Sequence, residues 1–264
     1  MSAATEARQA ELDRVLDAQE PIRTLADELF AVADLLESQA ALRTALSDLT
    51  APEDVRRQLA AAVLKGQVSA GAVAVIQAAA GLRWASGSAL AAAVERQGVR
   101  AVMHAAQAAG ELDTVEEELF RFSRIVVADH GLRDALEDRT ASIPGRQQLI
   151  ADLLAGKALD ATLVLAQRAV RAADRTFELT LESYLRLAAA QRQRAIAEVT
   201  VARPLSAEQA ERLRTALSAQ VGREVSLQVV VDPSVLGGVR VKLGDEVIEG
   251  TVAGRLEAAE RQLN

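Results

Sequence analysis

The sequence predicts a mainly α protein in which two repeated helical bundles precede a small α+β C-terminal domain with a β-hairpin. Three observations predict this fold. Apolar residues recur at three- and four-residue spacing over most of the chain, a shift of 90 positions aligns the chain with itself, and the pattern becomes alternating after residue 195. The expected domains are residues 1–95, the first helical copy, 96–194, the second copy, and 195–264, the α+β domain.

Composition and charge exclude several classes of function. Half of the residues are hydrophobic but only 2% are aromatic, so the core must consist mainly of Ala, Leu and Val, as in closely packed helices. The net charge of −7 argues against a nucleic-acid partner, since such binding requires clustered Lys and Arg. The absence of cysteine excludes disulfides and thiolate metal sites and fits a reducing cytoplasm.

No segment of the sequence predicts insertion into a membrane. We expect no secretory signal peptide, because residues 1–20 are charged throughout. The longest apolar run, residues 71–82, is shorter than the roughly 20 residues that cross a bilayer. Any membrane association is therefore expected to be indirect.

The helical part is a duplication. Residues 26–51 align without gaps on residues 116–141, with identities that include Leu29 with Leu119 and Phe30 with Phe120. The register continues as far as Gln167 in the second copy, which is too long for a short solenoid unit. We therefore interpret the repeat as a duplicated domain.

Each copy is predicted to contain five or six short helices. The apolar residues of the first long helix lie on one helical face. They are Leu25, Leu29, Val32 and Leu36. Turn-forming residues then separate the helices, at Pro21, Pro52, Gly66, Pro144 and Gly156. Residues 71–82 are apolar on all sides and are predicted to run through the first bundle, whereas their counterpart carries Arg168 and Arg171.

The C-terminal elements follow from the change of period. Residues 195–204 predict a strand that ends at Pro204. Residues 206–222 predict a helix with a capping box of Ser206 and Gln209 and a stop at Gly222. Residues 224–232 alternate in polarity and predict a second strand.

Residues 237–250 raise the question of a phosphate-binding loop, because they contain four glycines. Such loops open a helix with a spaced glycine pattern, and neither pattern occurs here. Instead, Val239, Val241 and Leu243 alternate with basic residues and predict a strand with one wet face. A type II′ turn at Gly244 and Asp245 would complete a hairpin, so backbone geometry explains the glycines.

Residues 232–263 closely resemble the C-terminal signature of the delta subunit of bacterial F-type ATP synthases, the counterpart of the mitochondrial oligomycin-sensitivity-conferring protein. The expected structural positions of this signature are Gly237, Gly238, Gly244, Asp245, Gly250 and Arg255. Glu249 and Thr251 stand where the family usually has Asp and Ser. The family order covers roughly residues 95–264, and the additional first copy looks like the longer delta subunits of actinobacteria.

The resemblance implies a noncatalytic stator subunit of a proton-translocating enzyme. It implies a hetero-oligomeric complex in which the helical domain grips the N-terminal segments of the alpha subunits and the C-terminal part binds subunit b. The chain would lie at the cytoplasmic face of the plasma membrane through this complex, with no catalytic residue, cofactor or metal of its own. We expect the second copy to keep the alpha-binding role and the first to add a further grip on the head or the stalk.

The residues also allow interpretations other than a stator subunit. A free-standing helical adaptor that binds other amphipathic helices is the alternative, and an enzyme ranks last because no nucleophile–base pair, metal cluster or nucleotide loop can be assembled. Trp84 is expected to pack in the interior, and His104 and His130 to be solvated or capping groups. Glu117 and Glu118 are expected on a solvated helix face. Arg192 and Arg194 are expected to complement a helix dipole.

Overall fold

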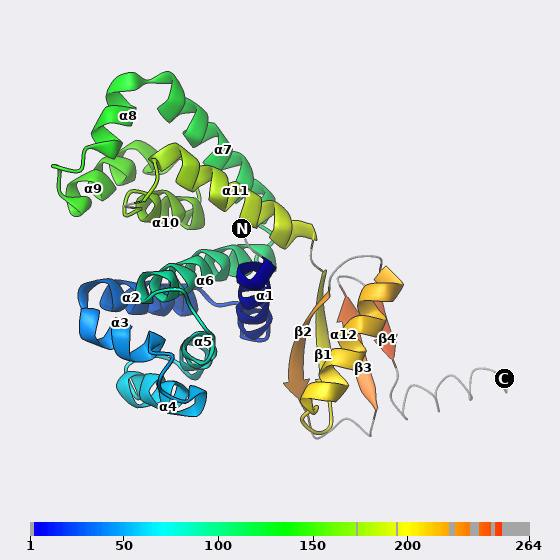
Figure 1. The fold of residues 1–264 in the computed structure, drawn as a ribbon. Helices are drawn as coiled ribbons and strands as arrows, with labels where there is room; N and C mark the ends of the chain where they lie inside the picture. Colours follow the sequence, from blue (N-terminus) through cyan, green and yellow to red (C-terminus); the bar gives the residue numbers. More distant parts are fainter. Residues whose placement is uncertain are drawn as a thin grey trace, which may run out of the picture. The chain divides into compact units, whose positions relative to one another are not determined.

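The computed structural model describes residues 3–172, 174–193, 195–221, 225–232, 238–243 and 246–249 (Figure 1). The chain divides into two compact units. One comprises Pro21–Arg192, and the other comprises Met1–Glu20 together with Gln193–Asn264. The first unit is helical and the second combines helices with a sheet, so the predicted fold class is confirmed.

The helical unit contains the two copies, each with five helices in its described part. The first consists of α2 (Arg23–Ser38), α3 (Ala40–Ser47), α4 (Glu53–Leu64), α5 (Ala70–Gly81) and α6 (Gly87–Ala108). The second consists of α7 (Leu112–Ala128), α8 (His130–Glu137), α9 (Ile143–Leu154), α10 (Asp160–Ala169) and α11 (Phe177–Gln193). From α3 to α6, each helix begins 90 positions before its counterpart, so the sequence repeat is a repeat of helices.

α6 crosses the boundary expected between the copies. The expected boundary at residues 95 and 96 lies inside α6, which continues unbroken from Gly87 to Ala108. Gly110 follows the end of the helix, and its φ of 73° lies in the left-handed region that favours glycine. We therefore propose that the first copy ends after α6 and that the second begins at α7.

A cross-helix cap occurs at equivalent places in both copies. The Glu28 carboxylate on α2 accepts a hydrogen bond from the Ser69 backbone N–H at 3.0 Å, at the start of α5. In the second copy, Glu118 accepts one from the Leu159 N–H at 3.0 Å and another from the Thr162 hydroxyl. Each carboxylate thus satisfies a helix N-terminus that has unpaired donors. The expectation that Glu118 is a solvated surface group is wrong, because its carboxylate is half-buried and bound to these two donors.

The turns after α3 and α8 are also built alike. Asp48 accepts hydrogen bonds from the backbone N–H and the hydroxyl of Thr50, and Asp138 accepts the same pair from Thr140. Hydrogen bonds to the charged form lower a carboxyl pKa. The backbone N–H of Thr50 chiefly lowers the pKa of Asp48, and the hydroxyl of Thr140 chiefly lowers that of Asp138.

The second unit contains α1 (Ala3–Asp17), β1 (Ala195–Val201), α12 (Ala207–Val221), β2 (Val225–Val231), β3 (Val239–Leu243) and β4 (Glu246–Glu249). The strand order is β2-β1-β3-β4. β1 and β2 are parallel and joined through α12, while β3 is antiparallel to both β1 and β4. The predicted strands, helix and hairpin are all present. The prediction that residues 1–20 belong to the first copy differs from this structure, where α1 contacts β2.

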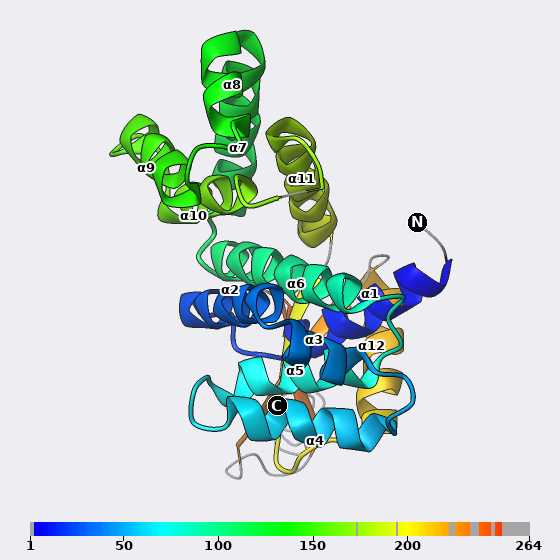
Figure 2. The same ribbon diagram turned by 60° about the vertical axis from the view of Figure 1, so that its left-hand side comes forward.

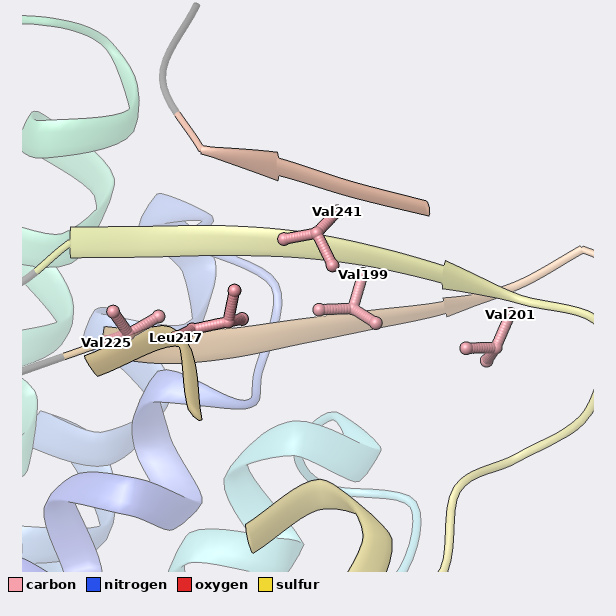
Figure 3. Close-up of a cluster of buried hydrophobic side chains, with 5 residues drawn as sticks. All are labelled: Val199, Val201, Leu217, Val225 and Val241. Atoms are coloured by element: carbon pink, nitrogen blue, oxygen red, sulfur yellow. The ribbon is translucent and has the colours of Figure 1, made fainter. Parts of the chain in front are cut away.

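The core of this unit lies between α12 and the sheet (Figure 3). It consists of Val199, Val201, Leu217, Val225 and Val241, all of which are buried. Arg240 and Lys242 are exposed, as predicted for a strand with one wet face. The predicted capping box is confirmed, because the Ser206 N–H donates to the Gln209 side chain at 2.9 Å and the Gln209 N–H donates back to the Ser206 hydroxyl at 3.2 Å.

The paired turns give a test with an internal control. Replacing Thr140 by Val removes the hydroxyl donor, so the pKa of Asp138 should rise toward its ordinary value of 3.8 while that of Asp48 stays lowered. Because the folded-state pKa is depressed, the contribution of Asp138 to stability is present above its ordinary pKa and is lost as the pH falls through the lowered value. Carboxyl titration by NMR measures both groups at once. An unchanged Asp138 pKa would contradict the assignment.

Candidate docking face of the second helical copy

The residues of the predicted signature are only partly visible. Gly238 precedes β3 with a φ of 90°, in the left-handed region that favours glycine. Gly237, Gly244, Asp245, Gly250 and Arg255 lie outside the described residues. Their structural role, and the type II′ turn at Gly244 and Asp245, therefore remain predictions.

The most informative difference lies between α2 and α7, the matching first helices of the two copies. Both bury the same apolar face toward the rest of their own copy. On α2 it consists of Leu25, Leu29, Val32 and Leu36, and on α7 of Val115, Leu119, Phe122 and Val126. The predicted core face is thus correct in both copies.

The adjacent face is treated differently in the two copies. α6 lies alongside α2 in both views (Figures 1 and 2), and Phe30 is only 7% exposed. A Cβ added to Gly98 of α6 would lie 2.6 Å from the Phe30 ring, so the glycine permits this close approach. The equivalent phenylalanine on α7, Phe120, is 56% exposed.

The contact between α7 and α11 differs from that between α2 and α6. The residue of α11 that corresponds to Gly98 is Ala188. α7 and α11 meet through an edge-to-face pair of Phe122 and Phe177, with ring centroids 6.0 Å apart. The corresponding residues of the first copy, Val32 and Gly87, form no aromatic pair, and Phe120 is exposed where Phe30 is buried.

The surroundings of Phe120 form an amphipathic strip, which we call the Phe120 face and define as Phe120, Arg124 and Val127. These residues lie at i, i+4 and i+7 on α7 and thus on one side of the helix. Phe120 and Arg124 are exposed and Val127 is half-buried. An apolar residue beside an exposed cationic end is suited to a partner with an apolar face and an acidic side chain.

Other residues singled out from the sequence have structural roles. Trp84 is buried as predicted and donates a hydrogen bond from its indole N–H to the Ala79 carbonyl at 2.8 Å. The expectation that His104 is solvated is wrong, because it is 1% exposed near the C-terminal end of α6. His130 is exposed at the start of α8, where its Nδ1 lies 2.8 Å from Arg133. Arg192 lies 3.6 Å from the Glu116 carboxylate, an ion pair that the sequence did not indicate.

Neither a metal-binding group nor a membrane-spanning helix occurs in the described part of the chain. Groups of three or more His, Asp or Glu side chains that could hold a metal ion do not occur in the described part of the chain. Among the helices that the structure describes, each is too short or too polar to cross a bilayer.

Comparison with known proteins agrees with the architecture. Residues 94–263 match the family model "ATP synthase delta (OSCP) subunit", which covers the second copy and the α+β part. Proteins called "ATP synthase subunit delta" match nearly the whole chain. That of Parafrankia sp. (strain EAN1pec) is 45% identical over 92% of this chain and 87% of its own length. Those of Cutibacterium acnes and Streptomyces avermitilis are 41% and 42% identical over 96% and 98% of this chain, and over 96% of their own lengths.

The architecture and the matches together identify the family of the chain. The fold defines a mainly α protein with a duplicated helical module and a small α+β unit. The chain belongs to the ATP synthase delta (OSCP) subunit family. Because the relatives match along the first copy as well, the duplication is shared with them.

The Gly98 contact can be tested directly. Gly98→Ala places a methyl group against a buried ring, so we expect a loss of about 1–3 kcal/mol in the free energy of unfolding despite the better helix propensity of Ala. Gly131→Ala is the matched control, because its nearest contact is an ordinary 3.4 Å to the Asp129 side chain. Urea denaturation of both variants measures the difference. Equal stabilities would show that α6 does not depend on the glycine.

Proposed function

We propose that the chain is a noncatalytic peripheral-stalk subunit of a proton-translocating F-type ATP synthase. In this role it links the alpha/beta catalytic head to subunit b and resists the torque of the rotor. Its family membership supports this role. The subunit is peripheral at the cytoplasmic face of the plasma membrane and is held there by the other subunits.

The second copy is the copy that grips an alpha subunit. The observation that carries this assignment is the exposure of Phe120 beside the burial of its counterpart Phe30. The first copy has closed this face with its own α6, whereas the second has left it available to a foreign helix. The family model also begins at residue 94 and so includes the second copy but not most of the first.

The chemistry of the Phe120 face specifies the segment that it receives. An amphipathic helix places apolar residues at i, i+3 and i+4 in a groove or on a face, and aromatic residues contribute most of the binding energy. Arg124 is exposed one turn beyond Phe120 and favours an acidic residue on the incoming helix. The N-terminal segment of alpha is proposed to present such a face.

The α+β unit is proposed to contact subunit b. Support comes from three exposed valines at the end of β2, an edge strand of the sheet: Val229, Val230 and Val231. Consecutive strand residues point to opposite faces, so these valines make the strand end apolar on both sides. Contiguous exposed apolar residues at a sheet edge are a common place for a partner to bind.

The alpha assignment is tested by one charge placed on each copy. Phe120→Asp should raise the dissociation constant for a synthetic alpha N-terminal peptide by about tenfold or more, because it removes an aromatic anchor. Val63→Asp is the control, since Val63 is exposed on α4 of the first copy and accepts the same charge. Fluorescence anisotropy measures binding, and circular dichroism checks folding. The reverse pattern would assign alpha binding to the first copy.

Point substitutions are preferable to truncation here. Removal of residues 1–95 would cut α6 in its first half and expose its buried face. The variants above leave every helix complete.

The contact with subunit b is tested separately. Val230→Glu should reduce recovery of subunit b with the tagged chain while alpha is retained, because a charge at the strand end opposes an apolar contact. Ala216→Glu, an exposed position on α12 of the same unit, should leave recovery unchanged. Co-purification from cells with quantitative mass spectrometry measures both partners. Recovery of the wild-type chain without alpha, beta or b would instead favour a free-standing adaptor.

A further inference from the structure

An ion cluster joins the two helical copies. We call it the Arg168 cluster. It consists of Arg168 and Arg171 from the second copy and Asp34, Glu37 and Glu95 from the first.

Arg168 is at the centre of the cluster. Its guanidinium donates two hydrogen bonds to Asp34 of α2, at 3.1 and 2.6 Å. It donates two more to Glu95 of α6, at 2.7 and 2.5 Å. Its side chain is 9% exposed, and its Cζ lies 4.6 Å from the centre of the Phe30 ring. One arginine of the second copy is thereby fixed against two helices of the first.

Arg171 strengthens the same contact. It lies 2.7 Å from the Asp34 carboxylate and 3.6 Å from that of Glu37. Burial by itself would lower the pKa of Arg168, but its hydrogen bonds to Glu95 and Asp34 raise it overall. Burial raises the pKa of Glu95 in spite of its bond with Arg168. The arginine is thus held in its charged form.

The cluster is not part of the repeat. At the corresponding positions of the other copy, the two arginines are replaced by Ala78 and Gly81, and the three carboxylates by Arg124, Val127 and Leu185. Not one of these residues preserves the charge of its counterpart. The cluster therefore belongs to the contact between the copies and not to the packing inside each copy.

The cluster lies far from the turn that joins the copies, so it can restrain the angle between them. The chain passes from α6 to α7 through a turn of Ala109, Gly110 and Glu111, where Gly110 has open space around it. Glu95 lies 13 residues before the end of α6, which corresponds to about 20 Å along a helix. An ion contact that far from the turn restrains rotation about it.

We propose that the Arg168 cluster is a lock that fixes the two helical copies as one rigid body. Bidentate bonds between arginine and carboxylates are directional, whereas an apolar contact tolerates sliding. Without the lock the copies remain folded and move about the turn at Gly110. This proposal concerns the chain by itself and does not depend on the peripheral-stalk role.

The test measures a distance between the copies in the full chain. The chain has no cysteine, so spin labels can be placed at Gln58→Cys on α4 and Ala135→Cys on α8, both exposed positions. Pulsed electron paramagnetic resonance then gives the distribution of distances. We expect one narrow distribution for the parent and a broadened or shifted one for Arg168→Met.

Two further variants keep the result decisive. Arg121→Met is the control, because Arg121 pairs only with Glu117 one turn away on the surface of α7 among the contacts described, and its distribution should match the parent. If Arg168→Met fails to fold by circular dichroism, Asp34→Asn replaces it, since that variant leaves Arg168 bound to Glu95. A folded variant of either kind that keeps the narrow parental distribution would overturn the proposal.

Discussion

The close contact between α6 and α2 at Phe30 is the constraint on which the rest of the helical unit depends. Gly98 allows the two helices to approach until the ring is covered, and Arg168 then stacks on the same ring from the second copy. Phe30 is therefore shared by the packing of the first copy and by the joint between the copies. Where this contact is absent, on α7, the matching ring is open to solvent.

Duplication followed by divergence at a few positions accounts for the two roles. A single pair of corresponding residues shows this well. Asp34 in the first copy is a ligand of the buried Arg168, and its counterpart Arg124 in the second copy is exposed beside Phe120. An arginine at position 34 would repel Arg168, and an aspartate at position 124 would remove the cation from the Phe120 face. The charge at this one position separates a joint from a binding surface.

Sequence patterns were sufficient for what is local or periodic. The capping box at Ser206 and the alternation in β3 depend on neighbours within a few residues, and the shift of 90 positions is a periodic pattern; the structure has all three. Contacts between distant residues could not be read in this way. The Glu118 carboxylate accepts from the Leu159 N–H, 41 residues away, and Arg168 donates to Asp34 across 134 residues. Arg168 was visible as a divergence between the copies, but its partners were not.

Gly98 is a further example of what a linear pattern misses. Glycine inside a helix usually weakens it. Here the missing side chain is compensated by the burial of a phenylalanine, and the helix continues. The position of the first twenty residues could not be predicted for a different reason. An amphipathic helix does not specify which apolar surface it will cover.

The choice of an ionic joint over an apolar one has a physical reason. Burying a charged cluster costs desolvation energy, and apolar residues of similar size often give equal or greater stability. Stability is therefore a poor explanation for five charged residues at one contact. What such a cluster supplies is a fixed angle, because bidentate bonds fail when the groups rotate out of plane. The proposed peripheral-stalk role requires that stiffness between the copy proposed to bind alpha and the other copy.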